Sequence, residues 1–126
     1  MTAHLEKTLH HFRYIYNMQI TWDDFSKIKM HVGTITHAEV FVEAKKPAYK
    51  LIIDFGPLGQ RKSSAQITKV YSPEELVGKQ VVAVLNFPPK QIANIQSECL
   101  VLGAVDGDSV ILLAPDKAVT NGLAIA

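Results

Sequence analysis

Cationic and small polar side chains gather in one part of the chain, between residues 44 and 72. The stretch holds one carboxylate, Asp54, and six cations: Lys45, Lys46, Lys50, Arg61, Lys62 and Lys69. Cations of this kind contact phosphates or carboxylates. The hydroxyl of Ser64 and the amide of Gln66 could hydrogen-bond phosphates or peptide groups. The stretch therefore indicates either a binding face or an ordinary solvated surface.

A second polar segment, NFPPKQIANIQSE over residues 86–98, separates two apolar stretches. Neither Pro88 nor Pro89 can donate to a strand ladder, so we expect backbone pairing to stop there and a stiff loop to follow. The segment is too long for a tight hairpin between the two apolar strands. Lys90 would project a cation from this loop. Ser97 and Glu98 would either latch the loop or contact a ligand.

Apolar surface rimmed by polar groups is what a polypeptide-binding site requires. The candidates are Phe87, Ile92, Ile95, Trp22 and Phe25. Ile92 and Ile95 would either anchor the loop on its own domain or line a groove across a dimer. Trp22 and Phe25 would either plug the end of a barrel or meet a second subunit.

The sequence argues against catalysis and against a metal or other cofactor. Ser63 and Ser64 lie in a polar strand without a Gly-x-Ser-x-Gly elbow, and no Cys-x-x-Cys or His-Glu-x-x-His motif is present. Cys99 opens an apolar strand and is interpreted as inert packing. His31 and His37 alternate with core positions and are interpreted as satisfied or exposed side chains. We therefore expect no enzyme activity.

Length and composition fit one globular domain. The chain has 126 residues and a formal net charge of +1, so overall charge does not indicate a nucleic-acid binder. A single cysteine fits a reducing cytoplasm. No apolar run approaches the roughly 20 residues of a membrane span, so we expect no membrane insertion. Residues 98–126 carry four carboxylates and one lysine, which predicts an acidic part of the surface.

The expected elements follow from capping residues, glycines and alternation. A short helix should begin after Thr21 and end near residue 28, and a second should begin after Ser72 and end at Gly78. Strands are expected over 30–43, with Gly33 at a bulge or bend, and over 49–56, 60–67, 79–87, 98–105 and 109–115. Asp106-Gly107-Asp108 predicts a tight hairpin.

This order predicts an all-β fold: a five-stranded Greek-key OB-fold barrel with short helices and N- and C-terminal extensions, because an OB barrel carries a helix between its third and fourth strands. A β-sandwich is the alternative, although it usually shows about seven strands. Residues 18–126 would form this domain. Residues 1–17, with apolar side chains at helical spacing, would form an appended and unassigned arm.

The motifs KKPAYKL, SSAQIT, YSPEEL, NFPPKQI, SE-x-LVLG and LLAPDKAVTNG occur in this order, and together they resemble the CsaA family. These small bacterial proteins are built on the tRNA-binding domain that is also appended to some aminoacyl-tRNA synthetases. Cys99 departs from the family pattern, where an aliphatic residue is expected. The resemblance implies an OB core and a homodimer formed through terminal extensions. It also implies a chaperone that binds unfolded or pre-secretory polypeptides and assists their export.

The alternative that the resemblance leaves open is a tRNA-binding protein. Single-strand binders add aromatic side chains for base stacking. Only Tyr49 and Phe55 lie in the predicted second strand, and both should face the core. If RNA is the partner, the sequence therefore favours recognition of backbone and shape over base readout.

Overall fold

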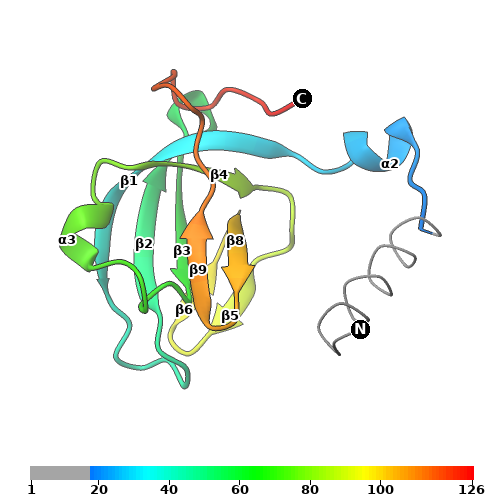
Figure 1. The fold of residues 1–126 in the computed structure, drawn as a ribbon. Helices are drawn as coiled ribbons and strands as arrows, with labels where there is room; N and C mark the ends of the chain where they lie inside the picture. The colour runs from blue at the N-terminus through cyan, green and yellow to red at the C-terminus, as the bar shows by residue number, and fades with distance from the viewer. Residues whose placement is uncertain (1–17) are drawn as a thin grey trace, which may run out of the picture.

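A computed structural model describes residues 18–126, in which a curved antiparallel sheet forms a nearly closed barrel (Figure 1). The expected arm over residues 1–17 lies outside the described residues. The helices are α2 (Trp22–Ser26) and α3 (Pro73–Leu76), and η1 (Gly56–Leu58) is a 3-10 turn. The strands are β1 (Met30–Val40), β2 (Tyr49–Asp54), β3 (Gln60–Ala65), β4 (Gln80–Val84), β5 (Lys90–Ile92), β6 (Ile95–Ser97), β7 (Leu100–Val101), β8 (Gly103–Asp106) and β9 (Ser109–Leu112).

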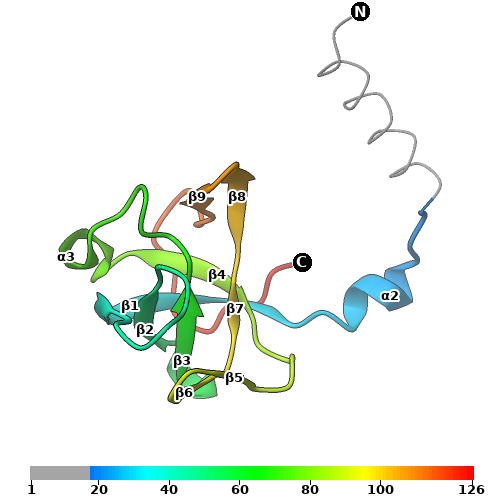
Figure 2. The ribbon, with the colours of Figure 1, turned by 90° about the horizontal axis from the view of Figure 1, so that it is seen from below.

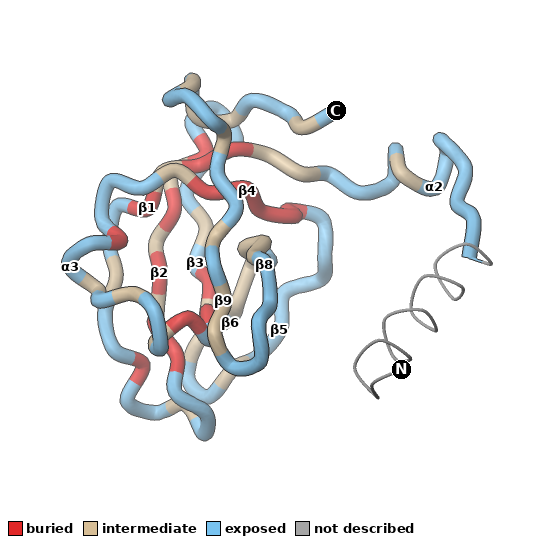
Figure 3. The backbone as a smooth tube through the Cα atoms, viewed as in Figure 1, coloured by how far each residue is buried: buried red, intermediate tan, exposed pale blue. Residues whose placement is uncertain are grey.

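The main sheet has five strands in the order β3-β2-β1-β4-β7. Two further two-stranded sheets, β5-β6 and β8-β9, complete the barrel. This arrangement confirms the all-β, OB-like fold, including the helix α3 between the third and fourth strands. The buried positions are concentrated in β1 to β4, as Figure 3 shows.

Alternation in β2 explains how the core is filled. Tyr49, Leu51 and Ile53 are buried, and the intervening residues are half-buried. Phe55 continues the inward series beyond the strand and is fully buried. The prediction that Tyr49 and Phe55 face the core is therefore confirmed. Neither ring is available for stacking on a base.

Gly33 marks close packing, and the bulge, one of the two features expected there besides a bend, lies elsewhere in β1. The register of β1 against β2 shifts between Ile35 and His37, so the bulge lies three residues further along. A Cβ at Gly33 would stand 2.7 Å from side-chain atoms of both Ile53 and Phe55. The glycine is required because these buried side chains pack directly against the β1 backbone.

Both predicted helix starts are confirmed by their caps. Thr21 and Asp24 form a reciprocal capping box at α2, and Ser72 and Glu75 form one at α3. Helix α2 is shorter than expected and ends at Ser26. Among residues 18–126, no helix has the length and apolar character needed to cross a bilayer.

The segment between β4 and β7 contains a hairpin that the sequence analysis missed. Lys90 pairs with Ser97, and Ile92 pairs with Ile95, so β5 and β6 form a short ladder inside the predicted loop. Its turn places Ala93 at φ 47°, a conformation more usual for glycine or asparagine. Pairing does stop at Pro88 and Pro89, as expected. The predicted strand over 98–105 is also divided, into β7 and β8.

The tight hairpin at Asp106 is confirmed, because Asp106 pairs with Ser109 around a two-residue turn. The last residues return along the start of β1: the Gly122 N–H donates to the Val32 oxygen, and the Val32 N–H donates to the Leu123 oxygen. Gln80 bonds both the N–H and the C=O of Val119. These bonds fix the C-terminal segment on the barrel wall.

Candidate ligand-binding groove

A groove of about 780 Å³ lies where the β1–β2 loop faces the β5-β6 hairpin across β3. Figures 1 and 2 place this loop and this hairpin at the same end of the barrel. We call it the basic groove and define it by six of its polar lining residues, Lys45, Lys46, Ser64, Gln66, Lys90 and Ser97; Glu43 and Gln91, which were not predicted, line it as well. All six were predicted as binding candidates, and the fold brings them together from segments far apart in the sequence.

The cations stand on opposite walls of the basic groove. Lys45 and Lys46 come from the β1–β2 loop, whereas Lys90 opens β5 on the other side. All three side chains are exposed. None of them takes part in the four ion pairs found within residues 18–126. Their charges are therefore free to meet a ligand.

Apolar residues also line the groove, among them Ala44, Ala48, Ile92 and Leu100. Leu100 is 49% exposed, and Ile92 is half-buried. The groove therefore offers accessible aliphatic surface with cations on two sides.

One carboxylate, that of Glu43, also lines the groove, and it is neutralised within the protein. The Nζ of Lys50 lies 3.5 Å from a Glu43 oxygen and 4.9 Å from the centre of the Phe41 ring. The Lys50 side chain is only 23% exposed. Lys50 was predicted to contact ligand, but its position is that of an internal partner that fixes the β1–β2 loop.

The other predicted cations lie away from the groove lining. Arg61 follows the inward-facing series of β3, and its guanidinium approaches the Leu85 oxygen at 3.5 Å. Lys62 is exposed on the opposite face of the strand. Lys69 forms an exposed ion pair with Asp108 at 3.8 Å. The basic segment of the sequence is therefore divided among at least three environments.

Ser97 and Glu98 close the barrel against the free edge of β3. The Ser97 hydroxyl accepts from the Ser64 N–H at 3.2 Å, and the Glu98 carboxylate accepts from the Lys62 N–H at 3.0 Å. The Glu98 N–H donates to the Lys62 oxygen at 2.8 Å. This geometry is that of a latch, the first of the two alternatives. Ser97 additionally lines the groove, so its hydroxyl remains within reach of a ligand.

The apolar candidates fall into three groups. Ile92 lines the groove, its cross-strand partner Ile95 is half-buried beside it, and Phe87 is 55% exposed on the preceding loop. Trp22 is 85% exposed and meets Phe25 edge to face, with ring centroids 6.5 Å apart. Helix α2 projects away from the barrel in both Figure 1 and Figure 2, so the barrel-plug alternative is wrong.

Trp22 and Phe25 belong to a second concave region of about 730 Å³, lined also by Ile20, Thr21 and Ala126. We call these five residues the α2 surface. Ile20 is 67% exposed. The α2 surface is thus largely apolar and open to solvent.

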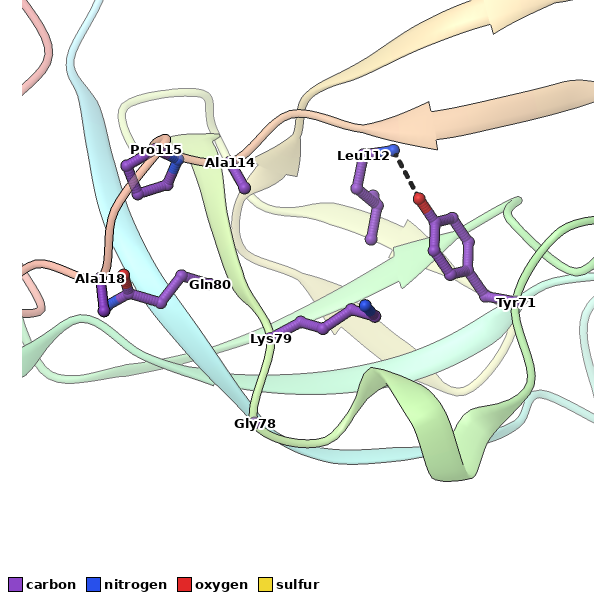
Figure 4. A pocket seen from close by; sticks show the side chains of 8 residues that line it. All are labelled: Tyr71, Gly78, Lys79, Gln80, Leu112, Ala114, Pro115 and Ala118. Atoms are coloured by element: carbon purple, nitrogen blue, oxygen red, sulfur yellow. Dashed lines mark hydrogen bonds between the residues drawn. The ribbon is translucent and has the colours of Figure 1, made fainter.

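A third, smaller pocket of about 320 Å³ lies beside α3 (Figure 4). Tyr71 and Leu112 stand on one side of it and Pro115 and Ala118 on the other. The Tyr71 hydroxyl accepts from the Leu112 N–H at 3.0 Å. The pocket shares no lining residue with the basic groove.

The possible nucleophiles in and beside the basic groove, Ser63 and Cys99, have structural roles. Ser63 is buried and donates to the Cys99 oxygen at 3.1 Å. Burial raises the pKa of the Cys99 thiol to about 11, so the thiolate is disfavoured. Within residues 18–126, no three His, Cys, Asp or Glu side chains lie close enough together to hold a metal ion.

A small OB-type barrel whose loops form a cationic, apolar-floored groove belongs to the class of binding domains. The family described as "Putative tRNA binding domain" matches residues 30–124. A crystal structure of the chaperone CsaA from Bacillus anthracis shares 51% identity, with a TM-score of 0.83 over 86% of this chain and 100% of that one. A crystal structure of the CsaA chaperone protein from Picrophilus torridus shares 56% identity, with a TM-score of 0.81 over the same shares. The chain belongs to this tRNA-binding domain family and, within it, to the CsaA family.

The curated relatives include methionine–tRNA ligases. That of Methanococcoides burtonii is 39% identical over 107 residues, which are 84% of this chain. The matched region is only 16% of the ligase, so the chain corresponds to one part of that longer protein.

Proposed function

We propose that this protein is a non-catalytic chaperone that binds extended segments of non-native polypeptides, including preproteins awaiting export, in the basic groove. The observation that carries the proposal is the accessible aliphatic surface of Ile92 and Leu100 in a groove that Lys45, Lys46 and Lys90 also line. Apolar surface rimmed by polar groups suits an unfolded chain, which offers apolar side chains and peptide groups together. The two similar structures named as CsaA chaperones support the proposal.

The experiment measures binding of a chemically unfolded, fluorescently labelled client at low and high salt. Hydrophobic capture should persist at high salt, because excluded salts strengthen apolar burial. Ile92→Ser/Leu100→Ser should weaken client binding at least tenfold, on the scale of two apolar contacts. The control Val105→Ser/Ile111→Ser alters exposed aliphatic residues outside the groove and should leave binding unchanged. Equal binding by both variants would reject the basic groove as the client site.

A second candidate function is recognition of tRNA, supported by the family match and by the free charges of Lys45, Lys46 and Lys90. The groove lining includes no aromatic side chain, so recognition would use the RNA backbone and shape. Affinity should then fall steeply as salt rises, with a slope set by the number of phosphate contacts. Lys45→Ala/Lys46→Ala/Lys90→Ala should reduce that slope by about 3 if each lysine meets one phosphate. No measurable tRNA binding at low salt would remove this candidate.

We also propose that the protein is a cytoplasmic homodimer in which a second copy covers the α2 surface. The side chain of Trp22 is 85% exposed and that of Ile20 is 67% exposed. A monomer rarely leaves two neighbouring large apolar side chains so open to water. Ala126 lies in the same region, so α2 and the last residue would enter one interface.

A further inference from the structure

The charge pattern of the basic groove points to a particular class of client, and this inference rests on the proposed function. Lys45 and Lys46 come from the β1–β2 loop and Lys90 from β5, and Ile92 and Leu100 line the same groove. A segment lying in the groove would meet cations from two different elements beside the apolar surface. A segment that carries cations of its own would meet repulsion from both elements.

The groove contains no free carboxylate that could offset these lysines. Glu43 is the acidic lining residue, and its carboxylate is paired with Lys50 at 3.5 Å. Lys50 is held in place by its position over the buried Phe41 ring. The Glu98 carboxylate is engaged by the Lys62 N–H on the edge of β3. The field that a client meets is therefore set by the three unpaired lysines.

The remaining polar groups suit an extended main chain. The hydroxyl of Ser64 and the amide of Gln66 line the groove beside its apolar residues. Peptide groups of a strand-like segment could bond to them while alternate side chains point to the apolar residues. The side chains next to the buried one would then point to the open side of the groove, where the exposed lysine side chains can reach them.

We propose that the basic groove selects extended polypeptide segments in which an aliphatic residue is flanked on both sides by aspartate or glutamate. Apolar contact supplies the general affinity. The lysines on the two walls supply the discrimination, because rim charges change specificity more than they change overall affinity.

The test uses three labelled peptides with the same central aliphatic sequence, flanked by aspartate, by serine or by lysine, and measures fluorescence anisotropy at low and high salt. The aspartate peptide should bind about tenfold more tightly than the serine peptide at low salt, as three partly exposed ion pairs permit. The lysine peptide should bind least tightly. High salt should bring the three affinities together.

Substitutions in the groove distinguish the contribution of the lysine charges to peptide affinity from the contribution of apolar contact. Lys45→Gln/Lys46→Gln/Lys90→Gln should abolish the preference for the aspartate peptide, so that the aspartate and serine peptides bind this variant equally. The matched control is Lys69→Gln/Lys117→Gln, which removes exposed lysines outside the groove and should leave the preference intact.

The outcomes distinguish this inference from the proposed function. Equal affinity for the aspartate and serine peptides would overturn the selectivity and leave polypeptide binding standing. Failure of all three peptides to bind would overturn both. A third outcome would identify the groove as a phosphate site and overturn the inference. In that outcome tRNA displaces the aspartate peptide, the groove variant no longer binds tRNA, and the serine peptide does not bind at all.

Discussion

Glu98 and Lys62 exchange two hydrogen bonds across the closure of the barrel: the Glu98 carboxylate accepts from the Lys62 N–H at 3.0 Å, and the Glu98 N–H donates to the Lys62 oxygen at 2.8 Å. Glu98→Ala removes the first bond and should lower the free energy of unfolding by about 1.5–3 kcal/mol, the range for bonds to charged groups. Urea unfolding followed by circular dichroism measures it.

Two further variants define what this bond does. Glu98→Gln keeps an acceptor oxygen and should lose less stability than Glu98→Ala. Glu74→Ala removes an exposed carboxylate from α3 and should stay within about 0.5 kcal/mol of the wild type. An unchanged unfolding midpoint for Glu98→Ala, together with lost client binding, would assign Glu98 to the ligand and not to the latch.

Gly33→Ala should be strongly destabilising, because the new methyl would lie 2.7 Å from Ile53 and Phe55, which have no room to retreat. Overpacking of this kind costs about 1–3 kcal/mol. Thermal unfolding detects the loss as a lower Tm. Val42→Ala, at an 82% exposed position, provides the control, and similar Tm values for the two variants would contradict the close packing of β1 on β2.

Tyr49→Phe tests the buried hydroxyl that donates to the Tyr71 oxygen at 2.6 Å. The substitution leaves that carbonyl without its partner and should cost about 1–2 kcal/mol of unfolding free energy. Phe87→Leu, on the exposed loop before β5, should change stability by less than about 0.5 kcal/mol. Unfolding in urea compares the two, and a neutral Tyr49→Phe would mean that water replaces the hydroxyl.

The thiol of Cys99 should resist labelling in the folded protein. Its pKa rises from 9.0 to about 11 because of burial, so thiolate is scarce at pH 8. A chromogenic disulfide reagent should react slowly in buffer and rapidly once urea unfolds the chain. Rapid labelling in buffer would show that the groove exposes the sulfur.

The same shift predicts a pH dependence of stability. The folded state favours the neutral thiol, so its contribution is complete below pH 9 and is lost as the pH rises through about 11. The unfolding free energy of the wild type should therefore fall relative to that of Cys99→Val over that interval. A difference independent of pH would contradict the raised pKa.

Trp22→Ser tests the proposed dimer. Loss of the most exposed large apolar side chain of the α2 surface should shift the protein from dimer to monomer in sedimentation at micromolar concentration. Val42→Ser, at a position of the β1–β2 loop that is exposed to a similar degree, should remain dimeric. A monomeric wild type would reject the dimer.

Local signals in the sequence predicted local structure well. The capping boxes at Thr21 and Ser72 and the turn after Asp106 are each determined by a few neighbouring residues, and each is confirmed. The turn of the β5-β6 hairpin was not predicted because its residue with positive φ is Ala93, and the segment has no glycine that would indicate a tight turn. The role of Gly33 depends on Ile53 and Phe55, about 20 residues away, which no local pattern reveals.

The candidate site was only partly predictable for the same reason. Residue types identified the lysines, but Lys50 and Arg61 differ from Lys45 and Lys46 only in their surroundings. Glu43, which pairs with Lys50, was not predicted, although its place seven residues before Lys50 across the expected turn could have suggested it. The placement of lysines on facing walls requires the three-dimensional closure of the barrel.

The closure of the barrel also affects the order in which parts of the protein fold. Lys46 and Lys90 belong to walls that meet only when Ser97 and Glu98 have reached the edge of β3. During synthesis on the ribosome, a chain that ends before these residues lacks the hydrogen bonds that hold the β5-β6 hairpin to the edge of β3. We therefore expect the basic groove to form only after residue 98 has left the ribosome, and the proposed binding of clients to begin no earlier.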